Sequence, residues 1–238
     1  MIKAVLLDWG HTLFDTAGSV DFIVGWARAH GSEIDPNEAH RLWEIARRRS
    51  RNAEELAKGR DTSLELHRQC WSELWLDLEA SVPGVTEALY EFETTAAGWS
   101  PYADTAEVLQ ALYDRGVPVV VVSDVPFDLR PILAHFGLDH LIRAFVLSGE
   151  HGTIKPELRL FGIALDAVGV AAEQALMVGD NHNNDGAAVD AGIRTLLLPH
   201  VAHGEPRGLG LILDLIDASS RASQKIDGTL RRSSCMRD

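Results

Sequence analysis

Five polar residues that could together act on an anionic substrate follow short apolar runs or lie in the loops close behind them: Asp8, Ser123, Lys155, Asp180 and Asp185. A carboxylate such as Asp8 can attack as a nucleophile and so divide one difficult displacement into two easier ones. A lysine and a serine hydroxyl can stabilise the negative charge that develops during such a reaction. Several carboxylate oxygens gathered at one place suit a hard divalent cation such as Mg²⁺. The residue types therefore predict an acidic, metal-assisted active site centred on Asp8.

These residues can meet only if the strands before them share a sheet. Four short, nearly continuous apolar runs are typical of buried parallel strands: residues 3–7, 117–122, 175–178 and 195–198. Helical patterns that end at glycine lie between the runs: residues 105–115, 129–136, 158–168 and 185–191. The alternation predicts a doubly wound α/β fold, in which reactive groups gather beyond the carboxyl ends of the strands.

Residues 17–97 interrupt this alternation with long helical patterns, at 39–56 and 63–78, and contain or adjoin five of the six tryptophans. We expect a helical domain at 17–97, inserted into a core domain formed by 1–16 and 98–218. The arginine-rich stretch 47–51 is expected to form a solvated helix face, with contact between one arginine and an anionic substrate as the alternative. The polar tail at 219–238 is expected to be mobile.

Composition bounds the function without identifying it. The formal net charge is −13, which argues against nucleic acid as a partner because phosphate backbones require a basic surface. No apolar run is long enough for a membrane span, and the first residues do not resemble a secretory signal. The two cysteines, Cys70 and Cys235, are expected to be reduced thiols. A soluble, cytoplasmic protein is therefore expected. A small phosphorylated substrate remains compatible with the acidic charge, because a metal ion reverses the sign locally.

The polar residues and their order resemble the motifs of the haloacid dehalogenase-like (HAD) hydrolase superfamily, over residues 2–16 and 98–200. The four matching segments are residues 5–15, Ser123, residues 148–161 with Lys155 and Pro156, and Val178-Gly179-Asp180 followed by Asp185.

This resemblance implies that Asp8 is the nucleophile and that Thr12, Ser123 and Lys155 bind the phosphoryl group. It also implies that Mg²⁺ is held by four groups: the carboxylates of Asp8, Asp180 and Asp185 and the carbonyl of Gly10. The insertion at 17–97 would then be a helical cap that closes over the site.

The sequence departs from the family pattern two residues after Asp8. Most phosphatases of the family have a second Asp there, which protonates the leaving group, whereas this chain has Gly10 followed by His11. Such a group contributes about 10²–10⁴-fold in rate. His11 could supply the proton, or the substrate could have a good leaving group, as acyl phosphates do. Asp124 also departs from the pattern, since an Asn often follows the serine.

Three other functions remain open. Phosphonate-cleaving members have a similar first motif and use a cap lysine as a Schiff base, for which Lys58 is the sole candidate within 17–97. Dehalogenating members also lack the second Asp, but they do not need the metal carboxylates Asp180 and Asp185. A non-catalytic binding or regulatory protein could have kept the fold. A Mg²⁺-dependent hydrolase of a small phosphorylated metabolite accounts for the most residues.

Overall fold

A five-stranded parallel sheet forms the centre of the protein in the computed structural model, which describes residues 1–201 and 204–234. Its strands, in sheet order, are β5 (Ala144–Leu147), β4 (Val119–Ser123), β1 (Ala4–Leu7), β6 (Ala175–Gly179) and β7 (Arg194–Leu197). The three central strands are buried along their whole length, as expected for strands covered on both faces. Leu7 pairs with Val121 on one side and with Val178 on the other, so the loops after these strands begin at one edge of the sheet. The predicted α/β fold is confirmed.

Helices cover both faces of the sheet: α7 (Thr105–Asp114), α8 (Arg130–His135), α9 (Ser148–His151), α10 (Leu158–Val168) and α11 (Gly210–Ser234). Short 3₁₀ turns connect them: η3 (Asp139–Leu141), η4 (Ala172–Gln174) and η5 (Gly186–Val189). The helices predicted at 105–115, 129–136 and 158–168 correspond to α7, α8 and α10. The helix predicted at 185–191 is wrong, because only the turn η5 forms there. The Asp185 side chain binds the backbone N–H groups of the preceding loop rather than capping a helix.

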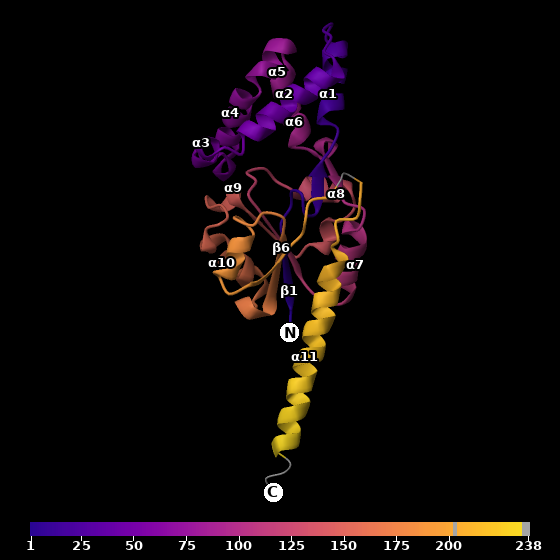
Figure 1. The fold of residues 1–238 in the computed structure, drawn as a ribbon, viewed down its shortest axis with the longest axis vertical. Coiled ribbons are helices and arrows are strands. Elements are labelled where there is room, and N and C mark those ends of the chain that lie inside the picture. Colours follow the sequence, from indigo (N-terminus) through magenta and orange to yellow (C-terminus); the bar gives the residue numbers. More distant parts are fainter. Residues whose placement is uncertain (202–203, 235–238) are drawn as a thin grey trace.

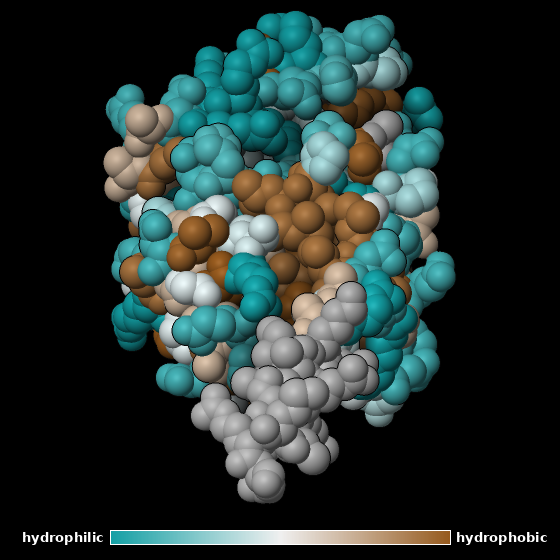
Figure 2. Space-filling view, turned by 60° about the horizontal axis from the view of Figure 1, so that its bottom comes forward, coloured by the Kyte–Doolittle hydropathy of each residue, from teal (hydrophilic) through white to brown (hydrophobic). Residues whose placement is uncertain are grey.

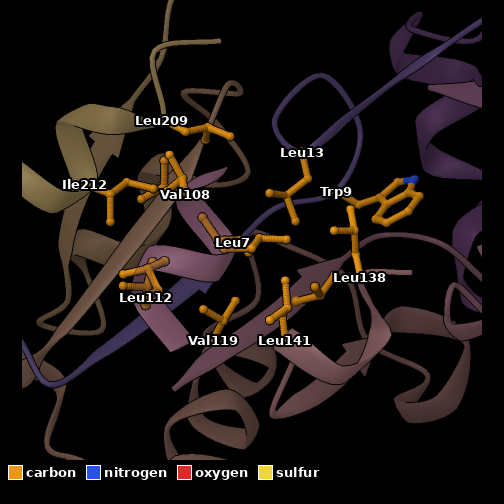
Figure 3. Close-up of a cluster of buried hydrophobic side chains, with 14 of the residues drawn as sticks. Leu7, Trp9, Leu13, Val108, Leu112, Val119, Leu138, Leu141, Leu209 and Ile212 are labelled. Atoms are coloured by element: carbon orange, nitrogen blue, oxygen red, sulfur yellow. The ribbon is translucent and has the colours of Figure 1, made fainter. Parts of the chain in front are cut away.

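One face of the sheet packs against α7 and the start of α11 through a cluster of hydrophobic side chains (Figure 3). Ile212 and Ile216 of α11 are buried in this cluster. Residues 219–234 continue the same helix, and the mobility predicted for the tail at 219–238 stays a prediction. Residues 235–238 lie outside the described residues. The buried first turns explain why a polar segment begins as a helix, since they fix the backbone from which it extends.

The segment between β2 (Phe14–Thr16) and β3 (Trp99–Pro101), called the helical segment below, consists of α1 (Ser19–Ala29), α2 (Pro36–Arg49), α3 (Ala53–Ala57), η1 (Arg60–Thr62), α4 (Leu64–Leu74), α5 (Leu76–Ser81), α6 (Val85–Glu93) and η2 (Ala96–Gly98). Its apolar residues form a hydrophobic cluster of their own, which includes Trp75 and Leu89. The two short antiparallel strands β2 and β3 connect it to the sheet. Figure 1 shows the helical segment beyond the end of the sheet opposite the N-terminus, where the strands have their carboxyl ends. It therefore covers the edge at which the polar residues emerge.

The end of the molecule opposite the helical segment has hydrophobic side chains on its surface (Figure 2). Figure 2 views the protein with this end turned forward and shows hydrophobic side chains gathered near the middle of the face. The large hydrophobic residues that are exposed outside the helical segment include Tyr113 on α7 and Leu211 and Leu215 on α11. Among the described residues, no helix combines the length and apolar character needed to cross a membrane.

Candidate active site

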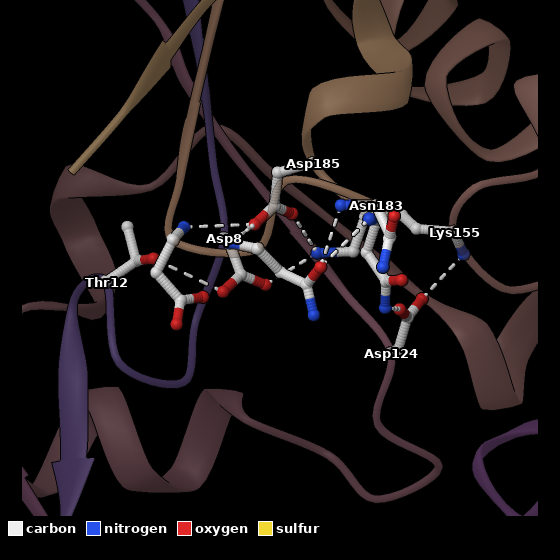
Figure 4. A network of polar contacts seen from close by, with 9 residues as sticks. Asp8, Thr12, Asp124, Lys155, Asn183 and Asp185 are labelled. Carbon is white, nitrogen blue, oxygen red and sulfur yellow. Dashed lines mark hydrogen bonds and ion pairs between the residues drawn. The ribbon is translucent and has the colours of Figure 1, made fainter. Parts of the chain in front are cut away.

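Lys155 links two buried carboxylates at the carboxyl ends of β1 and β6. Its Nζ lies 2.6 Å from Asp8 Oδ1 and 2.6 Å from Asp185 Oδ1 (Figure 4). All three side chains are almost completely buried. The other oxygen of Asp8, Oδ2, accepts a hydrogen bond of 3.3 Å from the Thr12 hydroxyl. Four of the residues predicted from the sequence therefore form one connected group around Asp8.

The loop after β6 holds the Asp185 carboxylate against its own backbone. Asp185 Oδ2 accepts hydrogen bonds of 3.0 Å from the backbone N–H groups of Asp180 and Asn181. Gly179 makes this approach possible, because a Cβ added at that position would overlap the Asp185 carboxylate. The glycine before Asp180 is thus a steric requirement of the site.

Burial and charge act in opposite directions on these groups. Burial raises the pKa of Asp8 to about 7, with a further increase from the Asp185 charge, although the Lys155 ammonium opposes the shift. Burial alone would lower the pKa of Lys155, but the neighbouring Asp185 and Asp8 carboxylates raise it well above its usual value. Lys155 is therefore a permanent cation. The single lysine does not neutralise the surrounding carboxylates, so the site retains negative charge.

The donor set around Asp8 fits a divalent cation. Asp8, Asp180 and Asp185 each offer one carboxylate oxygen, and the three oxygens lie within 4.8 Å of one another. Asp180 is exposed, whereas the other two are buried, so the cluster opens toward solvent on one side. Carboxylates that repel one another at this separation are stabilised by a hard cation, and Mg²⁺ prefers such oxygen ligands together with water. The three carboxylates among the predicted metal ligands are thus close enough to share one ion.

A small pocket of about 170 Å³ lies over this cluster and contains two further predicted groups. Ser123 and Gly10 line it together with Asp8, Lys155 and Asp180. Ser123 is buried at the end of β4. The position where the family has a second carboxylate faces an aromatic ring instead, because a Cβ at Gly10 would lie 3.9 Å from Cη2 of Trp99.

His11 faces a different direction. Its Nδ1 lies 3.0 Å from Asp15 Oδ1, and its Nε2 lies 3.1 Å from Nη2 of Arg47 in the helical segment. Because a guanidinium can only donate, Nε2 accepts and the proton resides on Nδ1. His11 has a positive φ of 56°, and its carbonyl accepts a hydrogen bond of 2.6 Å from Nε of Arg207. His11, which the sequence offered as a proton donor, therefore lies outside the small pocket, and both of its ring nitrogens contact other side chains.

Asp124, whose direction the sequence did not indicate, points toward the site. Its Oδ1 accepts a hydrogen bond of 2.8 Å from the Lys155 backbone N–H, and its Oδ2 accepts one of 3.0 Å from the Asn184 side chain. Burial raises its pKa, although Lys155 opposes the shift. Asp124 thus ties the lysine loop to the loop that carries Asp180 and Asp185.

A second cavity, of about 280 Å³, lies between the core and the helical segment. It shares Trp99, Asp124 and Val125 with the small pocket, so the two spaces adjoin. His11 and Arg47 also line it. A substrate with its reacting group over Asp8 would extend its other end into this cavity.

Lys58 does not meet the requirements of a Schiff-base lysine. Its Nζ lies 2.8 Å from Glu55 and 3.1 Å from Glu73, away from the residues that line either space. Hydrogen bonds to these two glutamates raise its pKa above the usual range. A Schiff base requires a neutral amine, so the structure counts against the phosphonate-cleaving alternative.

Sequence reasoning missed two contributors to the site. Trp99 was treated as one of several tryptophans near the insertion, and nothing in its local sequence marks it as a neighbour of Gly10. Arg207 is 2% exposed and donates to the carbonyls of His11, Leu198 and Pro199, although it lies in a loop without a motif. Both depend on long-range packing that no local pattern records.

Several known proteins with similar sequences are named phosphatases. A phosphoserine phosphatase of Thermus thermophilus is 40% identical over 98 residues, which cover 40% of this chain and 39% of that protein. A glyceraldehyde 3-phosphate phosphatase of Methanothermobacter thermautotrophicus is 24% identical over 204 residues, 83% of this chain and 86% of that protein. The chain matches less than half the length of the first curated relatives.

Solved structures share the fold at low sequence identity. A HAD phosphatase from Thermococcus onnurineus has a TM-score of 0.61 at 22% identity, over 90% of this chain and 98% of that chain. The L-2-haloacid dehalogenase of Xanthobacter autotrophicus has a TM-score of 0.65 at 19% identity, over 85% and 80%. The family model for haloacid dehalogenase-like hydrolases matches residues 2–192. With the sheet order, the Asp8–Lys155–Asp185 geometry and this match in agreement, the chain belongs to the haloacid dehalogenase-like hydrolases.

Proposed function

We propose that the protein is a Mg²⁺-dependent hydrolase of small phosphorylated metabolites that forms an aspartyl-phosphate on Asp8. The observation that carries this proposal is the position of Asp8, 2.6 Å from Lys155 Nζ and in a cluster of three carboxylates whose oxygens lie within 4.8 Å. The phosphatase names of the sequence relatives support it. Dehalogenation would not require the carboxylates of Asp180 and Asp185.

The proposed reaction has two displacements. An oxygen of the Asp8 carboxylate attacks phosphorus, the bond from phosphorus to the leaving oxygen breaks, and the leaving group takes a proton from solvent or from a group in the cavity. Water then attacks the phosphorus of the aspartyl-phosphate, which releases inorganic phosphate and restores the carboxylate. Asp8 Oδ2, held only by the 3.3 Å contact with Thr12, is the oxygen less engaged by the protein and the better placed to attack.

Charge neutralisation governs the first step, because an anion attacks an anion. Lys155 remains bonded to Asp8 Oδ1 and lies beside the phosphoryl oxygens, where its charge favours the transition state. Ser123 donates a hydrogen bond to the same oxygens, and Asp124 fixes the Lys155 backbone. A Mg²⁺ ion held by Asp8, Asp180, Asp185 and the Gly10 carbonyl would neutralise further phosphoryl charge when bound.

The leaving group has no carboxylate beside it at Gly10, where Trp99 lies instead. This arrangement favours substrates with a good leaving group, such as acyl phosphates, over alkyl monoesters. The helical segment, which we interpret as a cap over the site, would limit the access of water and select the organic part of the substrate.

The test compares wild-type protein with Asp8→Asn in Mg²⁺, using acetyl phosphate, p-nitrophenyl phosphate and an alkyl phosphate. We expect turnover of at least one substrate, loss of this turnover in Asp8→Asn, and normal turnover in Asp114→Asn, a matched change on the exposed end of α7. Acid-quenched protein should carry one phosphoryl group by mass spectrometry. Full activity in Asp8→Asn would refute the nucleophile, and no turnover of any substrate by the folded wild-type protein would favour a non-catalytic role.

A further inference from the structure

Arg47 is a partly buried cation on the wall of the cavity between the core and the helical segment. It stands near the C-terminal end of α2 and lines this cavity beside His11 and Thr16. The sequence predicted a solvated helix face for residues 47–51, but the Arg47 side chain is mostly buried, and burial lowers its pKa. Its guanidinium lies 4.7 Å from the ring centre of Trp43, which covers one face of the group.

The hydrogen-bonding partners of Arg47 are neutral. Nη1 donates to the Thr16 hydroxyl at 3.3 Å and Nη2 to His11 Nε2 at 3.1 Å. A guanidinium has five N–H donors, so further donors remain for a ligand. Within the part of the chain that the structure describes, no carboxylate lies within ion-pair distance of Arg47. A buried charge is ordinarily paired, because removing it from water without a partner is costly.

Two nearby arginines have the carboxylate partner that Arg47 lacks. Arg60, on the same cavity, lies 3.2 Å from Asp61 and donates at 2.6 Å to the Ser50 carbonyl. Arg49, two residues along α2, lies 3.0 Å from Asp77 at the surface. Among the described residues, Arg48 and Arg51 also have no ion pair with a carboxylate, but both are exposed to solvent, whereas Arg47 is partly buried.

Glu93 is the carboxyl group that could weaken this conclusion, because it lines the same cavity. Its Oε1 already accepts hydrogen bonds from Ser19 at 2.8 Å and Trp43 at 2.9 Å. Burial raises the pKa of Glu93, although the hydrogen bonds from Trp43 and Ser19 and the charge of Arg47 oppose the shift. Glu93 therefore orients Trp43 beneath the guanidinium without forming an ion pair with it.

We propose that Arg47 binds a second anionic group, a carboxylate or a phosphate, on the organic part of the substrate. The proposal rests on the proposed phosphoryl site at Asp8, since it treats the cavity as the continuation of that site past Trp99 and Asp124. The planar guanidinium pairs with either anion through two parallel hydrogen bonds. Because α2 belongs to the helical segment and Thr16 and His11 belong to the core, the same anion would also hold the two parts together.

Binding measurements test the proposal independently of turnover. In the Asp8→Asn background, calorimetry in Mg²⁺ compares ligands that differ in the second group: 2-phosphoglycolate against ethyl phosphate, 6-phosphogluconate against glucose 6-phosphate, and glucose 1,6-bisphosphate against glucose 6-phosphate. The first two pairs test a carboxylate at two distances, and the third tests a phosphate. Each pair is measured with Arg47 intact, with Arg47→Met, and with Arg49→Met, which removes the same charge from the exposed face of α2.

With Arg47 intact, we expect at least one dianionic ligand to bind about 10- to 100-fold more tightly than its partner, as for a hydrogen bond to a charged group. Arg47→Met should abolish that preference, Arg49→Met should retain it, and Arg47→Lys should keep part of it if Arg47→Met does not fold. Equal binding within every pair, or an unchanged preference in Arg47→Met, would overturn the proposal. If either of these two results is obtained while the wild-type protein turns over simple phosphates, this inference fails but the proposed function stands.

Discussion

Replacing the nucleophile should stabilise the protein when no metal is present. Asp8 has a pKa of about 7 in the folded protein, against the 3.8 of an unperturbed Asp. The folded state therefore holds the proton more tightly than the unfolded state, and the stability associated with the neutral carboxyl is lost as the pH rises through 7. At about 1.36 kcal/mol per pKa unit, the penalty approaches about 4 kcal/mol at pH 8 and about 2 kcal/mol at pH 5. These figures are upper bounds.

Asn fits the same position with little loss of contacts. Its Oδ1 can accept the hydrogen bond from Lys155, and its Nδ2 can donate to the Thr12 hydroxyl, which both donates and accepts. Lys155 keeps Asp185 as an ionic partner at 2.6 Å. We therefore expect Asp8→Asn to unfold at a higher urea concentration than the wild-type protein at pH 8 in EDTA.

The assay is urea unfolding of both proteins at pH 5 and pH 8, with and without Mg²⁺. In EDTA, the advantage of Asp8→Asn should be at least about 1 kcal/mol at pH 8 and should shrink by about half at pH 5. Saturating Mg²⁺ should stabilise the wild-type protein more than the variant, because the ion binds the folded state through Asp8. A variant that is less stable at pH 8, or whose advantage does not depend on pH, would refute the reasoning.

Three further substitutions test other parts of the site. Lys155→Met leaves Asp8 and Asp185 buried without their shared cation, so we expect the free energy of unfolding in urea to fall by about 3–5 kcal/mol at pH 8. The loss should be smaller at pH 5, where Asp8 is protonated, and equal losses at the two pH values would contradict this. Gly179→Ala places a Cβ on the Asp185 carboxylate, so turnover and Mg²⁺ affinity should both fall by at least about 10-fold. The control, Gly162→Ala, has open space at the new Cβ and should change neither quantity. Arg207→Met removes donors to three backbone carbonyls and should cost about 2–4 kcal/mol by thermal or urea unfolding; wild-type stability would show that these hydrogen bonds do not hold the loop.

The sheet and the acidic cluster were predictable because each depends on a local signal. The central strands are apolar throughout, and a buried parallel strand requires this of every residue. Asp8, Ser123 and Asp180 follow such strands directly, and topology then brings them to one edge. The edge strand β5 was not predicted, although its four residues are apolar, because Arg143 interrupts the apolar run and leaves only a short segment.

The rest of the site depends on contacts between distant segments. The sequence marked Asp124 as unusual, but its direction is set by a backbone N–H 31 residues away. Arg47 was assigned to a solvated face because four arginines lie within five residues, and helical periodicity alone does not tell which of them faces the core. Residues 186–189 form a turn in place of a helix because the Asp185 side chain accepts hydrogen bonds from the backbone of the preceding loop. It is therefore not available to cap a helix that begins at this point.

The two strands that join the helical segment to the sheet have a consequence for how such proteins diversify. β2 and β3 are hydrogen-bonded neighbours, with Asp15 opposite Ser100 and Thr16 opposite Trp99. The segment therefore leaves and re-enters the core at points about 5 Å apart, the spacing of paired strands. A short turn could bridge such a gap, so the whole segment resembles an insertion in a hairpin loop. Recombination at this ribbon could exchange one insertion for another and leave the register of the sheet intact. Trp99 lies on the junction and lines the small pocket, so a new insertion would inherit the nucleophile and the lysine but would have to rebuild its contact with that indole.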